Sequence, residues 1–77
     1  MVDIQIGQVI KYELRRQGKS NKWLAERIHV NPRTINKIFL KNIIDTNQLM
    51  IISRVLGVDF FKHFSIQFEE SKQKNSG

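Results

Sequence analysis

Apolar residues recur at helical spacing along most of this chain, and that period limits the fold more than any other feature. The first such segment predicts an amphipathic helix over roughly residues 6–17. Its apolar positions follow i, i+3, i+4, i+8: Ile6, Val9, Ile10 and Leu14. Gly18 comes next, and glycine readily takes the left-handed conformation that ends a helix.

Two more helices are marked by residues that favour helix ends. Ser20 is a good N-terminal cap for a second helix, which we expect to end near His29. Asn31-Pro32 then opens a third helix, because asparagine caps well and proline suits the first helical position. The connection between these two helices is only about three residues long, which is a tight turn.

The second half of the chain predicts a linker and two further helices. Residues 41–44 form the linker, and we expect Ile43 and Ile44 to enter the core. Asp45 or Thr46 begins the fourth helix, and Gly57 ends it. A short fifth helix then follows a cap at residue 59.

No strand-like alternation precedes residue 65, and the segment SIQF that begins there is too short to assign as extended. We therefore predict an all-α, compact five-helix domain over residues 1–68, with a short, polar and flexible tail over residues 69–77. A chain of 77 residues without cysteine has no disulfide or thiolate metal site to stabilise it. It must depend on packing, and on a partner subunit where packing falls short.

The positive charge lies in one part of the chain. The formal net charge is +6, yet residues 45–77 contain equal numbers of basic and acidic residues. Residues 21–44 carry five basic residues and one acidic residue. A localised basic excess indicates an anionic partner, with nucleic acid the leading candidate, although a basic solvated surface would also explain it.

The second and third helices, with the tight turn between them, form a helix-turn-helix pattern. On the third helix, Ile35, Ile38 and Phe39 share one face, which predicts burial. A basic stripe at i, i+4, i+8 lies opposite: Arg33, Lys37 and Lys41. Residues 27–44 contain no aspartate or glutamate, whereas a merely solvated helix more often mixes the two signs.

The stretch SNKWLAERIHVNPRTINKIF resembles the helix-turn-helix of lambda-repressor-like transcription regulators, the phage repressor and Cro superfamily. The match uses Leu24-Ala25 and the apolar positions of the third helix, and the resemblance extends over roughly residues 5–64. The motif itself covers about residues 20–40. His29 stands where the family usually has glycine, and Pro32 stands where some members place a base-contacting side chain.

The resemblance implies sequence-specific binding of double-stranded DNA and regulation of transcription. Arg33 and Lys37 match base-reading positions, and Thr34 matches a contact to a thymine methyl or a phosphate. Six residues are expected to contact phosphates: Ser20, Asn21, Lys22, Asn36, Lys41 and Asn42. A homodimer would place two recognition helices about one DNA turn apart. Four phenylalanines near the end of the domain are candidates for the dimer contact: Phe60, Phe61, Phe64 and Phe68.

Other functions remain open at this point. The same fold serves protein-interaction modules of an antitoxin-like or phage-derived adaptor kind, in which the phenylalanines would be the working surface. Peripheral binding to an anionic membrane is a weaker reading, because it does not explain the order of helices. We expect no enzyme activity and no cofactor, since phosphate-loop, metalloprotease and cysteine-nucleophile motifs are missing from the sequence. Metal binding by His29 and His63 is not expected either.

Trp23 is expected to be partly buried, because indole fills space well. The sequence shows no signal peptide and no apolar run long enough to span a membrane, which suggests a cytoplasmic protein.

Overall fold

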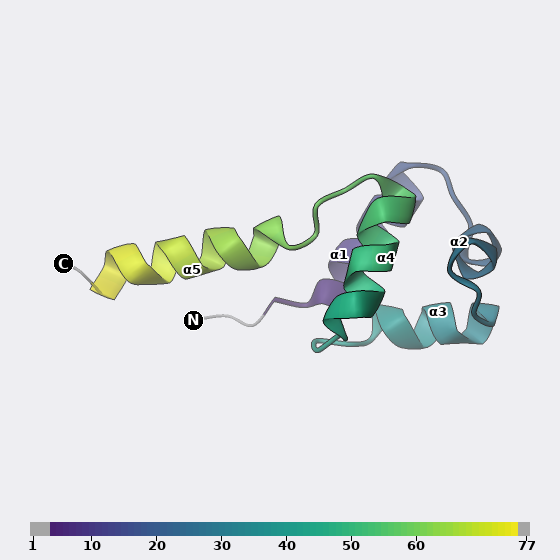
Figure 1. Cartoon of the computed structure of the whole chain (residues 1–77), viewed down its shortest axis with the longest axis horizontal. Helices are drawn as coiled ribbons and strands as arrows, with labels where there is room; N and C mark the ends of the chain where they lie inside the picture. Colours follow the sequence, from purple (N-terminus) through teal and green to yellow (C-terminus); the bar gives the residue numbers. More distant parts are fainter. Residues whose placement is uncertain (1–3, 76–77) are drawn as a thin grey trace.

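The computed structural model describes residues 4–75 and contains five α-helices in that range (Figure 1). They are α1 (Ile6–Arg16), α2 (Asn21–Ile28), α3 (Pro32–Phe39), α4 (Thr46–Leu56) and α5 (Lys62–Asn75). No strand occurs between residues 4 and 75, so the predicted all-α class is confirmed.

The helix ends follow the predicted local signals. The side chains of Ser20, Asn31 and Asp45 each accept a hydrogen bond from a backbone N–H in the first turn of α2, α3 and α4, respectively. Gly18 and Gly57, which follow α1 and α4, have φ values of 70° and 68°. Both glycines therefore take the left-handed conformation expected after a helix.

The core is apolar and draws on α1 to α4 and on the segment before α5. Its buried members are Ile6, Ile10, Leu14, Leu24, Ala25, Ile35, Ile38, Phe39, Leu49, Ile52, Leu56 and Phe60. The helices that contact each other most are α2 with α3, α1 with α3, and α2 with α4. This packing holds α3 from one side and leaves its other side to solvent.

The start of α1 is bonded to the end of α3. The N–H of Gly7 donates to the carbonyl of Lys41 at 2.9 Å, and the Gln8 side chain donates to the carbonyl of Phe39 at 2.8 Å. The Gln8 bond satisfies the last carbonyl of α3, which has no partner within the helix, and the Gly7 bond satisfies a carbonyl of the loop that follows. The two bonds hold the start of α1 against the end of α3 and the loop that follows it.

Two predictions about the second half of the chain are wrong. Ile43 is 86% exposed rather than buried, while its neighbour Ile44 packs against the core as expected. The fifth helix is not short, because α5 has 14 residues and includes the SIQF segment as well as residues 69–75 of the expected tail. Its C-terminal part extends away from the other helices (Figure 1), and the Cα trace measures 47 × 22 × 20 Å along its principal axes.

His29 carries the strain of the turn between α2 and α3. It has φ 61° and ψ 46°, in the left-handed region that costs a residue with a Cβ about 1–2 kcal/mol. We expect His29→Gly to raise the free energy of unfolding by about 1 kcal/mol, less than the full strain because glycine also loosens the unfolded chain. Urea unfolding would measure the change. His29→Ala is the control, since it keeps the strain, and an equal gain from both variants would contradict this explanation.

Candidate nucleic-acid interface

Helices α2 and α3 contact each other and are joined by a tight turn. Ala25 of α2 is buried, and its carbonyl accepts the N–H of Val30 at 2.9 Å across the turn. His29 and Asn31 shape this turn through the left-handed backbone and the cap described above. The predicted helix-turn-helix geometry is therefore present.

The two faces of α3 differ in chemistry as predicted. Ile35, Ile38 and Phe39 point into the core and are buried. Four polar residues occupy the rest of the helix surface: Arg33, Asn36 and Lys37 are exposed, and Thr34 is half-buried. The orientation of α3 is thus fixed by its apolar side, and its polar side is available to a partner.

The predicted basic stripe is shorter than expected on the helix itself. Helix α3 ends at Phe39, so Lys41 lies beyond it in the loop and does not continue the line of Arg33 and Lys37. Lys41 and Asn42 are both exposed. Leu40, the C-terminal cap, is 81% exposed and adds an apolar side chain at this edge.

A chain of side-chain hydrogen bonds joins α1, α2 and α3 beside this surface. The guanidinium of Arg15 donates to Oδ1 of Asn21 at 2.8 Å, and Nδ2 of Asn21 donates to Oδ1 of Asn36 at 2.9 Å. Two predicted phosphate-contacting residues, Asn21 and Asn36, are therefore held in place by each other. Arg15 was not among the predicted site residues, because nothing in the local pattern ties residue 15 to residue 21.

The first turn of α2 lies next to this network. Ser20 Oγ accepts the N–H of Trp23 at 3.0 Å, and Lys22 is exposed.

Trp23 packs partly against the core, as predicted, and its ring is flanked by two cations. The Lys19 Nζ lies 4.7 Å and the Arg27 guanidinium carbon 5.2 Å from the ring centroid. The i+4 spacing of Arg27 from the tryptophan along α2 was a sequence signal for one of these contacts, whereas Lys19 precedes the cap of α2 and its position depends on the folded turn.

One basic residue near this region is neutralised by a local pair. Arg16 donates to the carboxylate of Glu13 at 2.8 Å, and these bonds lower the pKa of Glu13 and raise the pKa of Arg16. Arg16 therefore adds less to the positive field than the unpaired Arg33 and Lys37, for which the structured residues supply no acidic partner.

Two other kinds of site find no support in the described residues. Across the described residues, no group of three or more histidine, cysteine, aspartate or glutamate side chains is arranged to hold a metal ion. Nor does any helix in that part of the chain combine the length and apolar character needed to cross a membrane.

Comparison with known families agrees with this geometry. A family model described as helix-turn-helix matches residues 10–62, which include most of α1, the whole of α2, α3 and α4, and the segment that leads into α5. No curated protein and no solved structure shows a significant match to the chain. The family is one of DNA-binding, non-enzymatic proteins. The chain belongs to the lambda-repressor-like helix-turn-helix family of DNA-binding regulators.

Proposed function

We propose that this protein binds specific sequences in double-stranded DNA by placing α3 in the major groove, and that it regulates transcription as a homodimer. The observation that carries the proposal is the polar face of α3, which is basic, free of acidic residues and separated from the core face. A surface of this kind matches both the shape and the charge of the groove.

Arg33 and Lys37 are the proposed base-reading residues. They lie on the exposed side of α3 one helical turn apart, with Arg33 in the first turn, which is the end that reads base edges in this motif class. The guanidinium of Arg33 suits the O6 and N7 acceptors of guanine. Thr34 is the third proposed base contact, through its methyl group or hydroxyl.

The proposed phosphate contacts surround α3. The Asn21–Asn36 hydrogen bond occupies Oδ1 of Asn36 as an acceptor, which leaves its NH2 group to donate to a phosphate oxygen. Lys22 supplies charge at the start of α2, and Ser20 keeps the exposed N–H groups there ordered. Lys41 and Asn42 would meet the backbone from the loop after α3. Such contacts set the register of the protein on DNA without reading sequence.

A protein-interaction module is the second candidate, and exposed apolar side chains favour it. Leu40 and Ile43 are more than 80% exposed, next to the proposed DNA surface. A module of this kind would bind its partner independently of Arg33 and Lys37, and its affinity would not fall steeply with salt.

Duplex binding at several salt concentrations tests the proposal. Random genomic fragments should bind the wild type with log K falling by about 0.9 per phosphate contact for each unit of log salt. Arg33→Ala with Lys37→Ala should lower affinity at least about 30-fold. Arg16→Ala with Arg54→Ala removes the same charge elsewhere and should have a much smaller effect. Absence of duplex binding at low salt, or equal losses in both double variants, would refute the assignment of α3.

A further inference from the structure

The guanidinium of Arg15 is held by three groups outside its own helix. It lies over the ring of Phe39, with its carbon 5.7 Å from the ring centroid. One of its nitrogens donates to the carbonyl of Lys19 at 3.4 Å, and another donates to Oδ1 of Asn21 at 2.8 Å. Because Phe39 is buried at the end of α3, the position of Arg15 is tied to α3 as well as to the start of α2.

The hydrogen bonds that begin at Arg15 have a direction. An arginine side chain only donates and stays charged, so the group that it meets must be an acceptor. Asn21 therefore turns Oδ1 toward Arg15 and donates from Nδ2 to Oδ1 of Asn36. The reverse orientation of Asn21 would set an NH2 group against the guanidinium and would lose both hydrogen bonds. Since a hydrogen bond from a charged donor is the stronger kind, Arg15 sets the orientation of both amides.

The last amide of this series faces solvent. Asn36 is exposed, and within residues 4–75 no acceptor is bonded to its Nδ2. With Oδ1 bonded to Asn21, Asn36 offers N–H groups to a partner outside the chain. Asparagine reads adenine through its oxygen and nitrogen together, so this orientation favours a phosphate oxygen over adenine. The neighbouring Arg33 and Lys37 are exposed and also lack an acceptor.

We propose that Arg15 is a positioning residue for the DNA surface: it fixes the amides of Asn21 and Asn36 so that they present N–H donors to the phosphate backbone. In this arrangement Arg15 acts through the two asparagines and does not contact DNA itself. The inference rests on the proposed function, because it assigns the acceptor to DNA. It adds α1 to a surface that is otherwise built from α2, α3 and the loop after α3.

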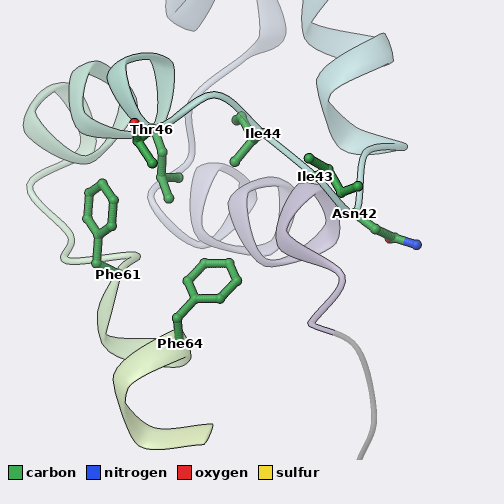
Figure 2. Close-up of a pocket in the computed structure, with 7 residues that line it drawn as sticks. Asn42, Ile43, Ile44, Thr46, Phe61 and Phe64 are labelled. Atoms are coloured by element: carbon green, nitrogen blue, oxygen red, sulfur yellow. The ribbon is translucent and has the colours of Figure 1, made fainter. Parts of the chain in front are cut away.

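The amide series is separate from the apolar surface beyond α3. An apolar groove with a volume of about 340 Å³ lies beside the linker before α4, and Phe61 and Phe64 form its other wall (Figure 2). Asn42, from that linker, points away from both rings in Figure 2. None of the three residues of the amide series lines this groove. A substitution at residue 15 therefore tests the DNA surface and leaves in place the apolar surface that a protein-interaction module would use.

Duplex binding by Arg15→Met measures the role of Arg15, and Lys11→Met is the matched control. Lys11 lies on the same helix, carries the same charge and is 5.9 Å from the centroid of the same Phe39 ring, but within residues 4–75 it makes no hydrogen bond to Asn21. On a duplex selected by the wild type, Arg15→Met should raise the Kd about three- to tenfold, as for the loss of one hydrogen bond. Lys11→Met should raise it less than about twofold. Equal losses in both variants would overturn the proposal.

Two further binding measurements separate positioning from direct contact. Arg15→Met should keep the wild-type slope of log K against log salt, because the NH2 groups of the asparagines carry no charge. A slope reduced by about 0.9 would mean that Arg15 itself meets a phosphate, against the proposal. In an Asn21→Ala background, where the link to α3 is already broken, Arg15→Met should change the Kd by less than about twofold. Losses that add in the double variant would overturn the role of Arg15.

NMR of the free protein tests the amide orientation without DNA. The side-chain NH2 protons of Asn21 should show a nuclear Overhauser contact to the Asn36 side chain in the wild type and in Lys11→Met, and should lose it in Arg15→Met. Backbone signals would verify that α1 to α4 remain folded in each variant. An Asn21 NH2 group that faces Arg15 in the wild type, or a contact that persists in Arg15→Met, would overturn the proposal.

The two levels of inference fail differently. A wild type that binds no duplex at low salt would refute the proposed function, and the role of Arg15 toward DNA with it. A wild type that binds duplexes and is unaffected by Arg15→Met would refute only the role of Arg15.

Discussion

Gly7→Ala is expected to lower the free energy of unfolding by about 2–3 kcal/mol, a large share of the stability of a small domain. A Cβ on Gly7 would lie 2.3 Å from the carbonyl oxygen of Ile38 and 2.5 Å from that of Phe39. Both obstructing atoms belong to the backbone at the end of α3, so no side-chain rotation relieves the clash. Helix α1 would have to move away, and the hydrogen bond from Gly7 to Lys41 would lengthen or break.

The sign of this effect separates the clash from helix propensity. Alanine is favoured over glycine inside a helix by about 1 kcal/mol, so propensity alone predicts that Gly7→Ala stabilises α1. Gly57→Ala is the control: Gly57 has φ 68°, and a Cβ there meets nothing within 4 Å. That variant should lose only the cost of the left-handed backbone, about 1 kcal/mol. Chemical unfolding of both variants would measure their free energies of unfolding and distinguish the clash from helix propensity. An unchanged or more stable Gly7→Ala protein would contradict the close approach of α1 and α3.

The helix boundaries were predictable because they depend on local signals. Ser20, Asn31 and Asp45 bond to backbone groups two or three residues away, and Gly18 and Gly57 need only their own φ freedom. The same is true of the two faces of α3, since the helical period decides which side chains lie together.

Features that depend on distant contacts were not predictable in this way. The need for glycine at position 7 arises from α3, more than 30 residues away, and no local pattern records it. Ile43 was expected inside because it is apolar, but the core beneath the linker is filled by Ile44. The length of α5 was missed because its polar residues resemble a frayed tail, and a helix that projects from a domain has no buried stripe in its own chain.

The candidate site also contains both local features, which the sequence predicts, and features that depend on distant contacts. The outward positions of Arg33 and Lys37 followed from the helical period. Lys41 was expected on the same line, but α3 ends at Phe39 and Lys41 lies in the loop, where its carbonyl accepts the N–H of Gly7. Arg15 joins the site through Asn21 of α2 and the ring of Phe39 in α3, and both contacts required the folded structure.

Arg33→Ala and Lys41→Ala are expected to weaken DNA binding in two different ways. Loss of the proposed guanine contact by Arg33→Ala should cost about 1–3 kcal/mol on the preferred site, roughly five- to 150-fold in Kd, and should relax the preference at one base position. Lys41→Ala removes a proposed phosphate contact from the loop. It should weaken binding to all duplexes about equally and reduce the slope of log K against log salt by about one unit.

Selection of bound sequences, followed by salt titration on the selected duplex, would measure both properties for each variant. Arg33→Lys adds a sharper comparison, because lysine keeps the charge but not the planar fork that donates two parallel hydrogen bonds. If Arg33 reads a base, Arg33→Lys should keep the salt slope of the wild type and lose most of the preference at that position. If Arg33 only neutralises phosphate, Arg33→Lys should keep both. Unchanged selectivity in Arg33→Ala would move base reading to Lys37 and Thr34, with Arg33 among the phosphate contacts.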